Sequence, residues 1–298
     1  MKPLSLSVII PTHNRPRSLQ SAVESVRAQT DPPHEIVIVD DGSSPPVDSK
    51  NFDGSMIPVR ILRNAEARGP AASRNAGVDH ASGDLVAFLD DDDTWVPWKL
   101  EFVSACFARH PDADVAIHRT GYQPSTRTDK HHWVALEDPL GRMLYRQPPH
   151  LDGVVVRRTH PLKSPLAERF EGAEDLDYLI RLAKSGARMV ETTAVLAILG
   201  VTETTVIGME QRIQGRLKLL TRHPEILTDG RATAFFYIRL GHLQRRAGMR
   251  SSAFISFLRA GLHAPSSPLV WKGFLHCLSP ISFGGSRQSS RSGRSEAE

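Results

Sequence analysis

Short apolar segments alternate with segments of helical periodicity through the first 110 residues, and this alternation limits the possible folds more than any other feature. The apolar runs cover residues 4–10, 35–39, 59–62 and 85–89. Strands that alternate with helices form parallel βαβ units. Continuous apolar strands belong to a sheet that is covered on both faces. The sequence therefore predicts an α/β fold with a mostly parallel, doubly wound sheet.

Polar side chains follow three of these predicted strands where each strand ends. Thr12 follows the first strand, Asp40 and Asp41 follow the second, and four consecutive aspartates at 90–93 follow the fourth. Ligands of open α/β sheets bind beyond the carboxyl ends of the strands. We therefore expect these side chains to meet at one edge of the sheet and to form the functional site.

The run of four aspartates, 90–93, is unfavourable on its own because like charges in close contact repel. A divalent cation removes that repulsion, and carboxylate oxygens suit magnesium or manganese. Magnesium is usually held by one or two carboxylates together with substrate phosphates. The run thus predicts a metal and a phosphate-bearing substrate, and the alternative interpretation is a solvated acidic turn.

Common phosphate-binding motifs do not explain this run. The chain has no Gly-x-x-x-x-Gly-Lys-Ser/Thr sequence, and its first strand leads into Pro11 and Thr12 rather than a Gly-x-Gly-x-x-Gly turn. Residues 90–94 match the Asp-x-Asp-x-Thr motif of haloacid-dehalogenase-like phosphatases. That motif usually lies near the start of a chain, and no convincing Gly-Asp-x-x-x-Asp motif follows here. Such a phosphatase is kept as an alternative.

Five segments, in order along the chain, resemble the inverting glycosyltransferases of family 2, which have the GT-A fold. The first four are 7–15 (SVIIPTHNR), 35–43 (EIVIVDDGS), 69–77 (GPAASRNAG) and 88–95 (FLDDDDTW). The fifth, 170–177 (FEGAEDLD), resembles the acidic motif that bears the catalytic base of that family. The resemblance covers residues 5–200 and implies a transferase that uses a nucleotide-sugar donor.

The resemblance also implies which residues hold the donor. Pro11 and Thr12 would line the pocket for the base and ribose, and Asp40 would accept a hydrogen bond from the base, which favours uridine. Arg74 would donate charge-assisted hydrogen bonds to the nucleotide or its phosphates. The full nucleotide-sugar-binding set implied in this way is Pro11, Thr12, Asn14, Asp40, Gly69, Arg74, Asp90 and Asp91.

The metal and the base are assigned by the same resemblance. Asp90 and Asp92 would hold manganese or magnesium, with Asp91 and Asp93 as the other register of equal spacing. Asp175 would be the general base that takes the proton of the acceptor hydroxyl during transfer with inversion. The metal would offset the charge on the departing diphosphate. An acidic helix N-terminus, favoured by the helix dipole, is the alternative for the acidic cluster around Asp175.

One departure from the pattern concerns the metal. Many GT-A enzymes carry a His after the base, which completes the metal coordination or contacts the diphosphate. Residues 195–205 contain no His, and His223 lies in a predicted helix. The metal would then be held by carboxylates, diphosphate and water.

The charge is distributed unevenly along the chain. Residues 1–200 hold 23 Lys and Arg against 27 Asp and Glu, whereas residues 201–298 hold 14 against 6. The pattern is helical from residue 208, and the last residues are rich in Ser, Gly and Arg. We therefore expect a GT-A domain over 1–205, a helical C-terminal region over 206–280 and a disordered tail over 281–298.

The basic helical region suggests a peripheral membrane contact. Arg245, Arg246 and Arg250 could form a basic and aromatic face with Phe254, Phe257 and Trp271, which would meet anionic lipid or a lipid-diphosphate acceptor. The alternative interpretation is a solvated helix face with a buried aromatic side. No apolar run is long enough to span a membrane, and two cysteines cannot form a disulfide framework. These features favour a cytoplasmic protein, in part at the inner face of the membrane.

The acceptor stays open among a glycan, a lipid-linked molecule and a small molecule. Nucleic acid is not expected because no matching motif is present. A non-catalytic protein that binds nucleotide-sugars or glycans is the second alternative to a transferase.

Overall fold

The computed structural model describes residues 4–54, 56–128, 130–158, 166–167, 170, 172–200 and 208–278. The strands are β1 (Leu6–Thr12), β2 (Glu35–Asp41), β3 (Val59–Asn64), β4 (Leu85–Phe88), β5 (Thr94–Trp95), β6 (Val115–Gly121), β7 (Val134–Ala135), β8 (Val154–Arg157) and β9 (Met189–Ile198). The helices are α1 (Pro16–Arg27), α2 (Pro70–His80), α3 (Lys99–Arg109), α4 (Pro139–Tyr145), α5 (Glu174–Lys184), α6 (Met209–Arg222), α7 (Glu225–Thr228), α8 (Gly230–Arg246), α9 (Arg250–His263) and α10 (Pro268–Leu278). Two short 3-10 helices, η1 (Ser49–Phe52) and η2 (Leu151–Gly153), complete the described elements.

One mixed sheet organises the first 200 residues. Its strand order is β3-β2-β1-β4-β8-β6-β9-β5, and β7 pairs with β9. The strands β1 to β4 are parallel, as the alternation of strands and helices predicts. β8 runs antiparallel to both β4 and β6, and β9 returns parallel to β6. The α/β prediction is therefore confirmed, with a reversal of strand direction at β8.

The parallel half of the sheet is held by the apolar runs. Every residue of β1 and β2 is buried, which agrees with a sheet covered on both faces. Helix α1 packs Leu19, Val23 and Val26 against one of these faces. Thr12 pairs with Asp40 in the β1–β2 register, so their strands end together at one edge of the sheet.

The region 110–150, for which the weak periodicity predicts loop with short strands, contains the strand β6, which is apolar only at its start. Two local predictions from the sequence were wrong: a helix over residues 95–109, and a cap of the first helix by Thr12 or Asn14. The helix expected from Trp95 begins at Lys99, because Trp95 pairs with Ala197 in the strand β5 and Pro97 follows. Neither Thr12 nor Asn14 caps α1; Arg15 is its N-cap, without a side-chain cap bond.

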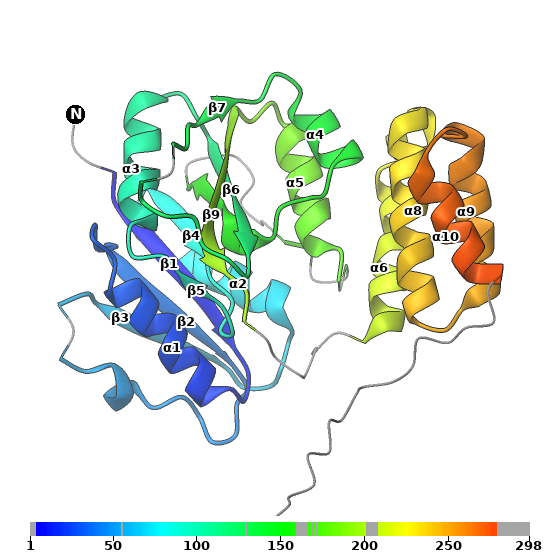
Figure 1. Cartoon of the computed structure of the whole chain (residues 1–298). Coiled ribbons are helices and arrows are strands. Elements are labelled where there is room, and N and C mark those ends of the chain that lie inside the picture. The colour runs from blue at the N-terminus through cyan, green and yellow to red at the C-terminus, as the bar shows by residue number, and fades with distance from the viewer. Residues whose placement is uncertain are drawn as a thin grey trace, which may run out of the picture.

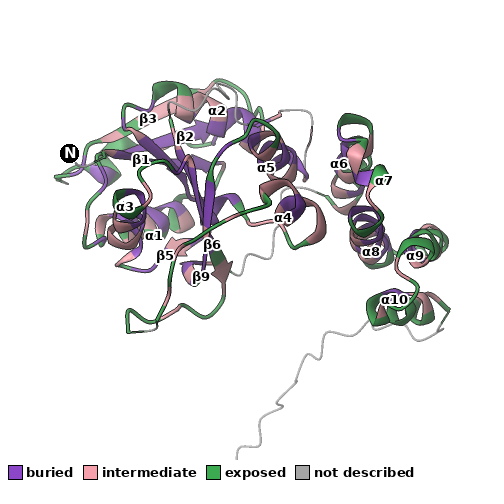
Figure 2. Ribbon diagram, turned by 90° about the horizontal axis from the view of Figure 1, so that it is seen from above, coloured by how far each residue is buried: buried purple, intermediate pink, exposed green. Residues whose placement is uncertain are grey.

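The C-terminal helices form a bundle beside the sheet, as Figure 1 shows. Their shared core contains Ile213, Leu219, Phe236, Leu240 and Val270. The short apolar segment 270–278 belongs to the helix α10, inside the region 206–280 that the sequence predicts to be helical. Figure 2 shows α9 and α10 with largely exposed outer faces. The predicted tail at 281–298 lies outside the described residues, as does the junction at 201–207.

The same apolar core ties the bundle to the sheet domain. Ala173 is one of its buried members, and Leu176 packs against it from the first turns of α5. The bundle is thus attached to the helix whose first turn carries Asp175.

None of the helices in the described ranges is long and apolar enough to cross a membrane.

Candidate active site

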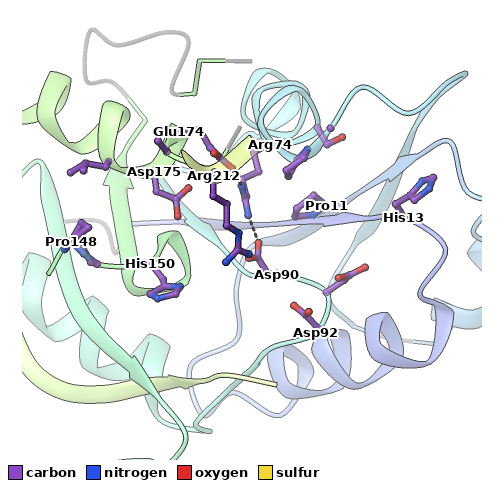
Figure 3. Close-up of a pocket in the computed structure, with 18 of the residues that line it drawn as sticks. Pro11, His13, Arg74, Asp90, Asp92, Pro148, His150, Glu174, Asp175 and Arg212 are labelled. Atoms are coloured by element: carbon purple, nitrogen blue, oxygen red, sulfur yellow. Dashed lines mark hydrogen bonds and ion pairs between the residues drawn. The ribbon is translucent and has the colours of Figure 1, made fainter. Parts of the chain in front are cut away.

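A pocket of about 730 Å³ opens at the carboxyl edge of the sheet. Its walls come from the ends of β1 and β4, the start of α2, the loop before η2, the first turn of α5, and the helices α6 and α8. Figure 3 shows the side chains that these elements turn toward one another. Segments far apart in the sequence therefore meet at one polar site.

Most of the residues expected from the sequence line this pocket. They are Pro11, Thr12, Gly69, Arg74, Asp90, Asp91, Asp92 and Asp175. Two expected residues, Asn14 and Asp40, are not part of the lining. Asn14 adopts a left-handed backbone with φ of 56° and accepts a hydrogen bond from the Ser44 amide.

Asp40 is buried beneath the loop that follows β2. Its carboxylate accepts hydrogen bonds from the amides of Ser43 and Val47, at 2.8 and 3.1 Å, and from Arg63. Burial raises the pKa of Asp40, but these hydrogen bonds outweigh it and hold the pKa below its ordinary value. The neighbouring Asp41 lines the pocket instead. Base recognition by Asp40 stays a prediction.

Asp91 and Asp93 are buried members of the aspartate run. Asp91 accepts hydrogen bonds from Thr12 Oγ1 at 2.7 Å and from Arg15 Nη1 at 3.0 Å. Asp93 accepts one from the Gly200 amide at 2.8 Å and does not line the pocket. Burial raises the pKa of both carboxyls. These two residues therefore fix the loop around the site.

Asp90 and Asp92 line the pocket and are each joined to a cation. Arg74 donates to Asp90, and Arg15 Nη1 donates to Asp92 Oδ2 at 2.8 Å. Two carboxylates beside a space large enough for phosphates are the donor set that magnesium uses. Among the residues that the structure describes, no group of three His, Cys, Asp or Glu could hold a metal. The pair fits a metal only if the substrate supplies the other oxygens.

A buried lysine lies beneath the aspartate run. Lys99 Nζ donates to the backbone oxygen of Asp152 at 2.9 Å and lies 3.4 Å from the centroid of the Trp95 ring. The Asp152 carboxylate in turn accepts from the Asp90 amide at 2.7 Å. Burial lowers the pKa of Lys99 and raises that of Asp152. This arrangement positions Asp90, and the amphipathic pattern of α3 gave no signal for it.

Three carboxylates occupy the first turn of α5, and they differ in their surroundings. Asp177 is fully buried away from the pocket, where it bonds Arg181 and His223. Glu174 lines the pocket, with Oε1 4.0 Å from Arg74 Nη1. Asp175 also lines it, and its Oδ1 is buried without a hydrogen-bond partner among the described residues.

The carboxyl of Asp175 is adjusted for proton transfer near neutral pH. Burial raises its pKa to about 7, with a further increase from Glu174 and Asp90, while Arg74 opposes these effects. A base is most effective when its pKa lies near the working pH. Asp175 is therefore the carboxylate of this turn best suited to accept a proton.

The pocket also contains basic residues that the sequence patterns did not reveal. They are His150, Arg212, Arg216, Arg239 and Arg246. The four arginines come from α6 and α8. Arg246, which the sequence suggested for a lipid-facing surface, lines the pocket instead, and the other three lie in the region noted for its excess of positive charge. The His expected after the base in many GT-A enzymes is not supplied by His223, which bonds Asp177; residues 201–205 lie outside the described ranges.

The sequence of the chain is similar to those of known glycosyltransferases. Residues 7–161 match the family model described as Glycosyl transferase family 2. A pre-mycofactocin glycosyltransferase of Mycobacterium tuberculosis is 31% identical over 196 residues, which are 62% of this chain and 40% of the relative. The UDP-Glc:alpha-D-GlcNAc-diphosphoundecaprenol beta-1,3-glucosyltransferase WfgD of Escherichia coli is 36% identical over 96 residues, 32% of this chain and 38% of the relative. The chain thus spans about two fifths of the length of these relatives.

The fold has relatives among solved structures. Residues 1–349 of S. aureus TarS, in complex with UDP-GlcNAc, superpose with a TM-score of 0.62 at 17% sequence identity. The match covers 92% of this chain and 90% of that one. The GT-A fold expected from the sequence is therefore confirmed, including the helices that follow the sheet.

Proposed function

The chain belongs to glycosyl transferase family 2, and from this we propose that it moves a sugar from a nucleoside-diphosphate donor to an acceptor hydroxyl with inversion. One observation carries the proposal: Asp175, with a pKa raised to about 7, faces the same pocket as Asp90, Asp92 and Arg74. A base and a site for the leaving diphosphate are the two groups that this reaction needs.

Asp175 is the proposed base. Its free carboxylate oxygen can accept a hydrogen bond from the acceptor hydroxyl and then take the hydroxyl proton. The hydroxyl oxygen forms its bond to the anomeric carbon as the bond from that carbon to the diphosphate breaks. Burial, and after it the neighbouring Glu174, keeps the pKa of Asp175 high enough for this proton to be held. The leaving group departs on the opposite face of the sugar, so the diphosphate belongs away from Asp175.

The donor is proposed to be a UDP-sugar. The TarS structure contains UDP-GlcNAc and the WfgD enzyme is named for UDP-glucose, which supports uridine among the nucleotides. Pro11, Thr12 and Asp41 at the ends of β1 and β2 would face the nucleoside, and Arg74 would donate to the diphosphate. The sugar itself is left open.

Asp90 and Asp92 are proposed to hold manganese or magnesium together with the diphosphate. The ion, when bound, would offset the negative charge that develops on the leaving diphosphate. Arg15 and Arg74 neutralise the same carboxylates in the structure. With an ion bound to Asp90 and Asp92, Arg15 and Arg74 would be available to donate hydrogen bonds to the diphosphate.

The acceptor side of the proposal includes a membrane surface. The outer faces of α9 and α10 expose large apolar side chains: Ile255, Leu258, Leu262, Leu269, Trp271, Leu275 and Leu278. Arg259 and Lys272 are exposed within the same two helices. Apolar side chains interspersed with cations are typical of helices that lie on anionic lipid. We propose peripheral contact at the cytoplasmic face of a membrane, which suits a lipid-linked acceptor.

The test is release of nucleoside diphosphate from a panel of UDP-, GDP- and dTDP-sugars with Mn²⁺ or Mg²⁺. Slow release of UDP without acceptor, accelerated by a correct acceptor, is expected of the transferase. A protein that only binds the donor would show tight binding with no release. Membership of family 2 removes the phosphatase alternative, which would instead release phosphate from simple phosphoesters.

A further inference from the structure

Four arginines of the C-terminal helices point to the pocket from one side. Arg212 and Arg216 lie one turn apart on α6, and Arg239 and Arg246 lie two turns apart on α8. Residues at these spacings share one face of a helix. Each helix therefore turns an arginine face toward the pocket, and Figure 3 shows Arg212 reaching into it.

Within the residues that the structure describes, no carboxylate pairs with these arginines. None of the four guanidinium groups makes an ion pair or a hydrogen bond with the part of the chain that the structure describes, and Arg239 Nε is a buried donor without a partner. Burial, together with Arg239 and Arg212, lowers the pKa of Arg216 to about 10. By contrast, Arg15 and Arg74 each contact a carboxylate. Gathered, partly buried cations are unfavourable unless an anion joins them.

The backbone places Arg212 beside the loop that carries the proposed base. The stem of Arg212 packs on Gly172, where an added Cβ would come within 3.0 Å of Arg212 Cα. Gly172 lies in the loop that leads directly into Asp175. Arg212 thus enters the pocket beside Asp175, the side on which the proposed reaction needs its acceptor, and the other three arginines line the same pocket.

We propose that Arg212, Arg216, Arg239 and Arg246 form a binding site for a phosphate group of the acceptor. This inference rests on the proposed function, which it narrows to acceptors that carry a phosphodiester or diphosphate near the reacting hydroxyl. The planar guanidinium fork matches phosphate oxygens and supplies paired hydrogen bonds. The same chemistry could serve the donor diphosphate, so the experiment must separate the two sources.

The test compares two double variants by titration calorimetry. Arg216→Gln with Arg239→Gln removes two charges of the cluster, and Arg231→Gln with Arg245→Gln removes two exposed charges of α8 outside the pocket. Inorganic pyrophosphate in EDTA probes the cluster, and UDP in Mn²⁺ probes the donor site. We expect the first variant to lose at least about tenfold in pyrophosphate affinity, with UDP affinity within twofold of the unaltered chain.

Three other outcomes decide against the proposal. Unchanged pyrophosphate affinity in the first variant means that the arginines bind no phosphate. A parallel loss of UDP affinity assigns them to the donor diphosphate, and an equal loss in the control variant shows a general effect of charge. If the unaltered chain binds no UDP, the proposed function fails, but the pyrophosphate comparison still reports on the cluster. Melting temperatures check folding, and removal of the crowded charge on Arg216 should not lower them.

Discussion

Nε2 of His223 lies 3.0 Å from Oδ1 of Asp177 and joins the end of α6 to the first turn of α5. Asp177 is fully buried, and it also accepts a hydrogen bond from Arg181 at 2.9 Å and pairs with Arg222. The acidic cluster of the sequence is thereby divided. Asp177 attaches the helical bundle to α5, and Asp175, two residues earlier, lines the pocket and is the base that we propose.

We expect His223→Ala to reduce the free energy of unfolding by about 1–3 kcal/mol, because it removes a hydrogen bond from a buried carboxylate. Burial raises the pKa of Asp177, but His223, Arg181 and Arg222 lower it below its ordinary value overall. The stabilisation is therefore present at neutral pH and is lost as the pH falls through the folded-state pKa. Urea unfolding at pH 7 measures the change, and the exposed His263→Ala is the control. Equal stability of the two variants would contradict this role of His223.

A second prediction concerns the base. Asp175→Asn keeps the shape of the side chain but cannot accept the proton, so transfer should fall by roughly 10²–10⁴-fold. Donor affinity should change little, since the diphosphate is expected on the opposite side of the pocket. Steady-state rates and calorimetry with UDP make the two measurements, and the exposed Asp112→Asn serves as the control. Near-normal turnover of the Asp175 variant would refute the assignment.

The pH dependence gives a third prediction. Asp175 must be ionised to act, so kcat/KM should rise about tenfold per pH unit in acid and level off near pH 7. Burial and Glu174 raise this pKa, so Glu174→Gln should shift the inflection to lower pH. A rate that does not vary between pH 5.5 and 8.5 would exclude Asp175 as the titrating base. The pKa of Asp175 is also higher in the folded chain than in the unfolded chain. The contribution of this group to the free energy of unfolding therefore falls as the pH rises from the unfolded-state pKa toward 7.

The strands of the parallel half could be predicted because short apolar runs rich in β-branched residues are typical of buried strands. The position of the strand β6 within 110–150 could not be predicted, because His118 and Arg119 interrupt its pattern after three apolar residues. The antiparallel direction of β8 depends on long-range pairing with β4 and β6, which no local pattern contains.

The residues of the candidate site also divide into those that a sequence motif predicts and those that depend on packing. Asp90, Asp92 and Asp175 could be found because each belongs to a motif of fixed spacing. The arginine cluster could not, since it depends on how α6 and α8 pack beside α5, and the sequence shows only an excess of charge. Asp40 belongs to a recognisable motif, yet hydrogen bonds within its own loop occupy its carboxylate.

A fourth prediction separates the metal pair from the loop pair. Asp92→Ala should weaken UDP binding in Mn²⁺ by at least about tenfold and remove its sensitivity to EDTA. Asp93→Ala should instead lower the melting temperature, because it leaves the Gly200 amide without its acceptor. UDP binding that is tight and insensitive to chelator in the unaltered chain would exclude a metal at Asp92.

The last prediction tests the outer faces of α9 and α10. Leu258 and Leu262 are 51% and 77% exposed and lie one turn apart on α9. We expect the chain to sediment with vesicles of phosphatidylcholine that contain 30% phosphatidylglycerol, and Leu258→Asp with Leu262→Asp to abolish this. The two added carboxylates would be unfavourable in the apolar interior of the membrane and would be repelled by its negatively charged surface.

The matched control for this experiment is Leu217→Asp with Leu227→Asp, two exposed leucines on α6 and α7. This variant should sediment like the unaltered chain, because its added charges lie outside the apolar face. Raised salt should weaken but not remove the binding, since buried leucine and tryptophan side chains contribute a part that salt does not screen. Two results would contradict binding of α9 and α10 to an anionic membrane. One is equal sedimentation of the two variants, and the other is equal sedimentation of the unaltered chain with and without phosphatidylglycerol in the vesicles.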